Sequence, residues 1–323
     1  MKRAQRNAAA DVPDSSTGAA ASCALSIKEA AEIIRAGGLV AFPTETVYGL
    51  GANALDPAAV QKIFEMKGRP ETSPLIVHVA PAEMARELVA EWPPMAEELA
   101  RLWWPGPLTL VLPKKNLVPD NVTAGLSTVG VRMPNHPIAL ELLEAAGVPI
   151  AAPSANRFTG LSPTTADHVR AAFGDAVPIL EGGPCTVGIE STVVAIADGK
   201  LKLLRPGMIS LGEIEHATVH IVGAAHPAPG MHQKHYSPRT RLILVRGASE
   251  LPDRTGAYVW RAALGPAARA VRMPLDAAPY AAQLYRVLHQ LDAENWPWIA
   301  VEMPPDAPDW SAIRDRLTRA AER

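Results

Sequence analysis

The sequence predicts an α/β protein of two domains: a larger one with a twisted mixed sheet and helices, and a smaller Rossmann-like α/β domain after it. Apolar runs typical of buried strands alternate with helix-like segments up to about residue 170, and strands cluster after that. A stretch rich in proline and glycine, 223–239, then breaks this rhythm before strands and helices resume. A chain of 323 residues, 48% of them hydrophobic, is long enough for more than one core.

The larger domain is expected to begin with a helix, because Ser26 and Glu29 form a capping-box pattern and Gly37-Gly38 stops the helical periodicity. Asp56-Pro57 is typical of an N-cap followed by the first helical residue, and the helix that it opens is expected to end at Gly68. The other expected strands and helices follow from their apolar patterns. The strands are 39–42, 74–79, 108–112, 129–133, 148–152, 177–180, 191–196 and 200–204, and the helices are 81–90, 94–103, 137–146 and 164–173.

The smaller domain is expected to contain strands at 241–245, 256–260 and 298–303, a helix at 277–294 capped by Asp276, and a last helix opened by Asp309. The N-terminus is rich in Ala and Ser and lacks the apolar core of a secretory signal, so we expect a flexible tail. The expected parts are therefore the tail (1–23), the larger domain (24–215), a linker (216–239) and the smaller domain (240–323).

Composition excludes several classes of protein. The formal charge is −2 and the pI is about 6.5, so bulk electrostatics favours neither a nucleic-acid coat nor a membrane surface. The two cysteines, Cys23 and Cys185, are far apart and form neither a disulfide framework nor a CxxC metal site, which is typical of a reducing compartment. No apolar run approaches the roughly 20 residues that span a bilayer. We expect a cytoplasmic protein without a membrane contact.

Polar residues cluster where expected strands end. Ligands of open α/β sheets bind in such places, because loops converge above the carboxyl edge of the strands. The clusters are PTETVYG with Thr44, Glu45, Thr46 and Tyr48; KGRPETSPLIVHV with Lys67, Arg69, Ser73 and His78; STVGVRMP with Thr128 and Arg132; APSANRFTGLSPT with Ser154, Asn156 and Ser162; and the additional Ser191 and Arg205. Three arginines and a lysine among hydroxyl groups suit a triphosphate and a carboxylate, which arginine binds through two nitrogens.

Each cluster also has a purely structural interpretation. Lys67 and Arg69 close a helix, where cations complement the helix dipole. His78 is compatible with a satisfied core histidine, Arg132 with a buried ion pair, and PSAN with a turn that bonds its own backbone. The combination favours a ligand site. A P-loop, a GxGxxG fingerprint, HExxH and GxSxG do not occur, so the corresponding enzyme classes are poorly supported.

Several of these segments together resemble the YrdC-like L-threonylcarbamoyladenylate synthase family. They are PTETVYGLGANA, KGRP with PLIVHV, WPGPLTLVL, VGVRMP, APSAN and STVV followed by LRPG, and they cover about residues 24–212 in order. The linker segment PGMHQKHYSP and the small C-terminal domain resemble the two-domain branch of that family.

The resemblance implies that L-threonine, bicarbonate and ATP are converted to L-threonylcarbamoyladenylate and pyrophosphate. The product would pass to a partner transferase that modifies an adenosine of tRNA, and tRNA itself is a potential contact. Mg²⁺ would enter with the ATP phosphates, with no metal ligand from the protein. The implied catalytic residues are Lys67 and Arg69; the implied ATP-binding residues are Arg69, Ser73, Thr128, Ser154, Asn156, Ser162, Arg205, His235 and Tyr236; and the implied threonine-binding residues are Thr46, His78, Arg132, Ala152 and Ser191.

The resemblance further implies that the linker closes over the nucleotide. We expect the first strand to deliver Thr46 to the amino-acid pocket and the following glycines to let the chain turn away beneath it. No convincing general base is present, so positioning is expected to supply most of the rate.

Three alternatives stay open at the level of sequence. The first is a double-stranded RNA-binding module without nucleotidyl transfer. The second is a carbamoyl-adenylate maker for metallocentre assembly, whose cysteine-rich zinc knuckles are lacking here. The third is a metal site in the linker formed by His226, His232 and His235, although no acidic or cysteine ligand joins them.

Overall fold

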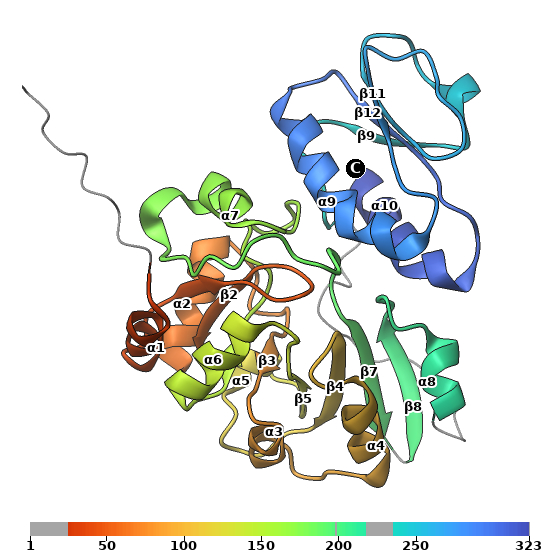
Figure 1. Cartoon of the computed structure of the whole chain (residues 1–323). Coiled ribbons are helices and arrows are strands. Elements are labelled where there is room, and N and C mark those ends of the chain that lie inside the picture. The colour runs from red at the N-terminus through yellow and green to blue at the C-terminus, as the bar shows by residue number, and fades with distance from the viewer. Residues whose placement is uncertain (1–24, 198, 218–234, 323) are drawn as a thin grey trace, which may run out of the picture.

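The computed structural model describes residues 25–197, 199–217 and 235–322, which form two sheets with helices around them (Figure 1). The expected tail (1–23) and most of the expected linker (216–239) lie outside the described residues. The helices are α1 (Ile27–Arg35), α2 (Pro57–Lys67), α3 (Glu83–Leu88), α4 (Pro94–Trp103), α5 (Asp120–Thr123), α6 (Pro137–Ala146), α7 (Ala166–Phe173), α8 (Leu211–Ala217), α9 (Ala277–Ala293) and α10 (Ser311–Ala321). The strands are β1 (Val40–Phe42), β2 (Gly49–Asn53), β3 (Ile76–His78), β4 (Leu108–Pro113), β5 (Thr128–Arg132), β6 (Ile150–Ala151), β7 (Thr192–Ala197), β8 (Lys200–Arg205), β9 (Leu242–Val245), β10 (Ala257–Trp260), β11 (Arg269–Arg272) and β12 (Ile299–Glu302).

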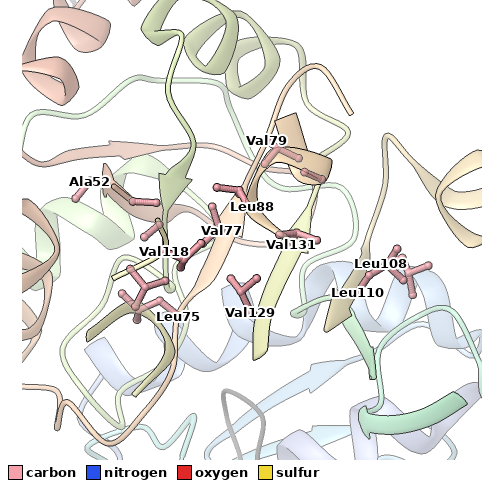
Figure 2. Packing of buried hydrophobic residues seen from close by; sticks show 14 of the residues in the cluster. Ala52, Leu75, Val77, Val79, Leu88, Leu108, Leu110, Val118, Val129 and Val131 are labelled. Atoms are coloured by element: carbon pink, nitrogen blue, oxygen red, sulfur yellow. The ribbon is translucent and has the colours of Figure 1, made fainter. Parts of the chain in front are cut away.

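The larger sheet is mixed, as predicted. Its strand order is β1-β2-β6-β3-β5-β4-β7-β8, with parallel pairs β3–β5 and β4–β7 among antiparallel neighbours. Figure 2 shows Val77, Val129 and Val131 of two adjacent strands within the same buried hydrophobic cluster as Leu108 and Leu110. These side chains fix the register of the central strands, because a slip by one residue would expose the apolar set.

Local capping signals define α1 and α2 as predicted. The Ser26 hydroxyl accepts the Glu29 N–H, and the Glu29 side chain returns to the Ser26 N–H. Asp56 caps α2, and Gly68 ends it at φ 62°, in the left-handed region that glycine adopts at little cost. This ending places Lys67 on the last turn and Arg69 immediately after it.

The structure corrects two expectations. Residues 177–180 form no strand; Ile179 makes one isolated bridge to Ala41. The glycines after Thr46 do not turn the chain away but belong to β2, antiparallel to β1. A Cβ on Gly51 would lie 2.8 Å from the Phe42 ring, so glycine here permits close packing. The sequence did not predict the strand β2, the short helices α5 and α8 or the edge strand β11.

The smaller sheet has the order β11-β10-β12-β9 and is parallel throughout, in agreement with the predicted second α/β domain. In Figure 1, α9 and α10 lie on the side of this sheet that faces the larger domain. One hydrophobic cluster contains Val47 and Ile189 of the larger domain together with Leu284 and Leu288 of α9. The two domains therefore share a core. Within the described residues no helix is both long and apolar enough to cross a membrane.

Candidate active site

A small cavity of about 60 Å³, partly open to solvent, lies at strands of the larger sheet. It is lined by Thr44, Thr46, Val47, Gly49, Arg69, Pro74, Leu75, Ile76, His78, Arg132, Ala152, Pro153, Ser154, Glu190, Ser191, Arg205, His235 and Tyr236. The structure thus brings together all five predicted threonine-binding residues and five of the predicted ATP-binding residues.

One end of the cavity is built around Arg132, the last residue of β5. Its Nη1 donates to the Thr46 hydroxyl (3.0 Å) and its Nε to the Gly106 carbonyl (3.2 Å). Its Nη2 lies 2.8 Å from a Glu45 carboxylate oxygen, yet the two atoms are not aligned as a hydrogen bond. The guanidinium is 4% exposed and keeps donor capacity toward the cavity. A carboxylate is the ligand that such a fork binds most strongly.

The loop that carries Thr46 is held by its own hydroxyl groups. The N–H groups of Thr46 and Val47 donate to the Thr44 hydroxyl, and that hydroxyl lies 2.8 Å from the hydroxyl of Thr46. The turn therefore presents Thr46 to the cavity in a fixed position. Thr44 was not among the predicted site residues, although it lines the cavity.

His78, the last residue of β3, lies beside Arg132 in the parallel β3–β5 pair. Its ring meets Phe42 edge-on, with the centroids 6.0 Å apart. Burial and, second, the Arg132 charge lower the pKa of His78 to about 3. The imidazole is therefore neutral at physiological pH and a weak base.

The buried histidine makes stability depend on pH. An unfolded-state pKa of about 6.5 lies above the folded value of about 3, so the unfolded chain takes up the proton first as pH falls. We expect His78 to reduce the free energy of unfolding by about 2 kcal/mol between pH 7.5 and pH 5. Urea unfolding at these pH values should show a smaller loss for His78→Asn than for the wild type. An equal loss of stability in His78→Asn and in the wild type would contradict the lowered pKa of His78.

The other end of the cavity is built around Arg205, at the end of β8. Its Nη2 donates to the Ser191 hydroxyl (3.0 Å) and its Nε to the Ser191 carbonyl (3.1 Å). The Ser191 hydroxyl is also 2.8 Å from that of Thr109. Arg205 is a predicted ATP-binding residue, and it holds Ser191, a predicted threonine-binding residue, at hydrogen-bond distance. This arrangement suits a reaction between the two substrates.

Arg69 is the third arginine of the lining. Its Nη2 donates to the Ser73 hydroxyl (2.6 Å) and to the Pro74 carbonyl (3.1 Å), so Ser73 positions Arg69 although it does not itself line the cavity. Burial lowers the pKa of Arg69 to about 10, which leaves the side chain charged at neutral pH. Arg69, Arg205 and Tyr236 interact electrostatically, and we call the part of the cavity that they form the nucleotide end, after the ATP contacts predicted for these three residues.

Lys67 lies behind the cavity wall. Its Nζ donates to the carbonyls of Ser154 (2.6 Å) and Asn156 (2.5 Å), and the residue is 2% exposed. Burial, with the nearby Arg69 charge, lowers the pKa of this ammonium well below its usual value. In this structure Lys67 holds the loop that carries Ser154 against the cavity. Its predicted catalytic role stays a prediction.

Besides Ser73, three predicted ATP-binding residues do not line the cavity. Asn156 donates to the carbonyls of Arg157 and Gly160 and lines a neighbouring cavity instead. The Ser162 hydroxyl donates to Glu190 (2.5 Å). Thr128 lies at the opposite end of β5 from Arg132. Their contacts with ATP stay predictions.

His235 and Tyr236 follow the undescribed part of the linker and lie in the cavity wall, 6% and 1% exposed. Their rings meet edge-on at 4.0 Å, and the His235 ring also meets Phe158 at 6.1 Å. Burial lowers the pKa of His235 to about 3, so this ring is neutral too. Of the three histidines considered for a linker metal site, His226 and His232 lie outside the described residues.

Sequence reasoning missed Glu190, a buried carboxylate of the cavity wall. It accepts from Arg316 Nε (2.8 Å), from the Ser162 hydroxyl and from the Tyr285 hydroxyl (3.2 Å). Burial alone would raise the pKa of Glu190. The charges of Arg316 and Arg205 outweigh this effect and lower the pKa to about 2. The one sequence signal was its place directly before Ser191 in GIEST.

The fold and the cavity define a class of protein: a two-domain α/β protein with a small cavity that is lined by three buried arginines. Comparisons with known proteins agree. The Sua5–YciO–YrdC family, described as "Telomere recombination", matches residues 32–207, and the family described as "Threonylcarbamoyl-AMP synthase, C-terminal domain" matches residues 209–322.

Individual relatives extend the match over nearly the whole chain. A threonylcarbamoyl-AMP synthase of Bacillus subtilis is 39% identical over 329 residues, which cover 91% of this chain and 92% of the relative. One of Pyrococcus abyssi is 52% identical over 233 residues, 68% of each chain. The crystal structure of P. abyssi Sua5 complexed with L-threonine superposes with a TM-score of 0.84 at 40% identity, covering 91% of this chain and 94% of that one. The chain therefore belongs to the two-domain Sua5 family of threonylcarbamoyl-AMP synthases.

Proposed function

We propose that the chain is a threonylcarbamoyl-AMP synthase that converts L-threonine, bicarbonate and ATP to L-threonylcarbamoyladenylate and pyrophosphate. The observation that carries the proposal is the cavity itself, which Arg132 and Thr46 line together with Arg69 and Arg205. One guanidinium serves the amino-acid carboxylate and two offset the triphosphate. Family membership supports the same chemistry, since the relatives carry this enzyme's name.

The reaction requires two bond-forming steps at this site. The threonine amine attacks bicarbonate and gives a carbamate with loss of water. A carbamate oxygen then attacks the α-phosphorus of ATP, and pyrophosphate leaves. Arg132 would hold the carboxylate, and Thr46 and Ser191 would meet the side-chain hydroxyl. Holding the reactants aligned can supply roughly 7–11 kcal/mol of the barrier. The neutral His78, with its pKa of about 3, contributes little as a base.

Mg²⁺ is proposed to enter with ATP and to offset charge on its phosphates. Among the described residues no group of three or more His, Cys, Asp or Glu side chains could hold a metal ion. The acidic residue of the cavity lining, Glu190, is already bound by Arg316, Ser162 and Tyr285. A metal held by the nucleotide would leave phosphate oxygens for Arg69 and Arg205 to bind.

Downstream, the labile product is proposed to pass in the cytoplasm to a transferase that modifies tRNA, and direct tRNA contact belongs to the same proposal. Closure of the linker over the site is supported by His235 and Tyr236, which belong to the C-terminal part of the linker and line the cavity. A structure of P. abyssi Sua5 with a histidine and a tyrosine replaced by alanine superposes with a TM-score of 0.85. The alternative of a double-stranded RNA-binding module is not favoured by these relatives.

The metallocentre alternative has a structural neighbour but little support. Full-length HypF in its phosphate- and nucleotide-bound form is 25% identical with a TM-score of 0.50, and the match covers 57% of this chain and 30% of HypF. This chain thus matches one part of that larger protein.

Pyrophosphate release tests the proposal. Purified protein is incubated with ATP and Mg²⁺, and each of L-threonine and bicarbonate is added or omitted. We expect release only when both are present. Threonine-independent release, or none from folded protein, would contradict the assignment.

The Thr46 hydroxyl is expected to recognise threonine. Removal of the protein group that hydrogen-bonds a substrate hydroxyl weakens the binding free energy by about 1–3 kcal/mol, because the substrate hydroxyl is left without a partner. Thr46→Val should therefore weaken threonine binding by about 10- to 100-fold in calorimetry. Thr46→Ser keeps the hydroxyl and should retain most of the affinity. Equal affinity of the valine variant and the wild type would remove Thr46 from the threonine site.

A further inference from the structure

Arg316, on the last helix α10, is the largest fully buried side chain in the described part of the chain, at 1% exposure. Arginine is rarely buried to this extent unless it is paired, because removal of its charge from water costs several kcal/mol. The groups that pair with the Arg316 guanidinium therefore indicate the role of its charge. Figure 1 places α10 on the side of the smaller domain that faces the larger one.

The main partners of Arg316 lie outside the smaller domain. Its Nε donates to a Glu190 oxygen (2.8 Å) and its Nη1 to the Pro206 carbonyl (2.8 Å), 126 and 110 residues away in sequence. Its guanidinium carbon lies 5.3 Å from the centroid of the Tyr236 ring, a cation–π contact. Within its own domain it also pairs with the adjacent Asp315 (3.0 Å).

Two of these partners, Glu190 and Tyr236, line the active-site cavity. The Glu190 carboxylate also interacts electrostatically with Arg205 of the nucleotide end. Without Arg316, an unbalanced carboxylate in this wall would repel a triphosphate and would compete with it for Arg205. The Tyr236 ring would also lose the guanidinium that packs against it, at the point where the linker enters the cavity wall.

We propose that Arg316 is a positioning residue for nucleotide binding: it neutralises Glu190 and fixes the Tyr236 ring, so that the C-terminal domain completes the nucleotide end of the active site. This inference rests on the proposed function for the identity of the ligand. It gives the smaller domain a defined part in the reaction, although Arg316 itself is not a lining residue.

The test compares Arg316→Met with Arg314→Met. Arg314 lies on the same helix and contacts the Pro304 carbonyl and Asp306, which both belong to the smaller domain. We expect Arg316→Met to weaken binding of a non-hydrolysable ATP analogue and to raise the KM for ATP by about tenfold or more, the effect of losing about one charge-assisted hydrogen bond. Threonine affinity without nucleotide should change less than about twofold, and Arg314→Met should match the wild type in both readouts.

A double variant keeps the test decisive if Arg316→Met alone is poorly folded. Glu190→Gln with Arg316→Met removes both buried charges and should melt closer to the wild type than Arg316→Met alone, since no unpaired charge remains. Its affinity for the ATP analogue should lie between those of Arg316→Met and the wild type, because the unbalanced carboxylate is gone while Tyr236 still lacks its partner. No recovery of affinity in the double variant, or equal losses of ATP and threonine affinity in the single one, would overturn the proposal. Binding of the analogue is measured without turnover, so it tests Arg316 even if pyrophosphate release contradicts the proposed reaction.

Discussion

Replacement of Arg132 by methionine is expected to reduce kcat/KM for threonine by about 10³-fold. The side chain is the proposed fork for the threonine carboxylate, and it also fixes the Thr46 hydroxyl (3.0 Å). Loss of two charge-assisted hydrogen bonds costs roughly 4 kcal/mol, which corresponds to about three orders of magnitude in rate. Steady-state kinetics with threonine as the varied substrate measures the effect.

The same change should destabilise the protein, because Glu45 would be left as a buried carboxylate without its cation. Removal of one partner of such a pair costs about 3–5 kcal/mol. The double variant Arg132→Met with Glu45→Gln should recover much of the stability but not the activity. Arg170→Met, which breaks only exposed ion pairs with Asp167 and Glu181, serves as a control and should change little. Near-normal threonine kinetics in folded Arg132→Met would refute the carboxylate assignment.

Replacement of Lys67 by methionine is expected to lower kcat/KM for ATP by about 10²-fold. Its ammonium holds the Ser154 and Asn156 carbonyls, so its loss releases the loop that borders the cavity. Hydrogen bonds from a charged donor contribute about 1.5–3 kcal/mol each, enough for an effect of this size. Kinetics with ATP as the varied substrate measures it.

Lys62 provides a matched control on the same helix. Its Nζ donates to the Gly37 carbonyl (2.6 Å), which is not part of the cavity lining. Lys62→Met should therefore leave ATP kinetics close to normal. If both methionine variants behaved alike, Lys67 would have only a general structural role.

Features encoded by neighbouring residues could be predicted from the sequence. The Ser26 and Asp56 caps and the Gly68 stop act within one helical turn, and the structure confirms them. The role of Gly51 could not be read in the same way. The close approach of the Phe42 ring depends on the pairing of β1 with β2, which the local pattern does not contain.

The same distinction applies to the site. Thr46, Arg132 and Ser191 line one cavity, as expected from the polar clusters. They do not share one carboxyl edge, because Ser191 directly precedes β7, which runs antiparallel to β5 in the mixed sheet. The pairing of Glu190 with Arg316 joins two domains across 126 residues of sequence, and neither residue carries a local signal for it. Thr128 shows the converse: the motif places it near Arg132 in sequence, while the strand carries the two residues to opposite ends.

The most direct test of the proposed reaction is to supply ¹³C-bicarbonate with ATP, Mg²⁺ and L-threonine and to analyse the nucleotide product by mass spectrometry. We expect an adenylate with the mass of L-threonylcarbamoyl-AMP that carries the labelled carbon, formed in equal amount with pyrophosphate. The label must appear because the carbamate carbon derives from bicarbonate. An unlabelled adenylate, or AMP and pyrophosphate without a threonine-containing product, would contradict the assignment.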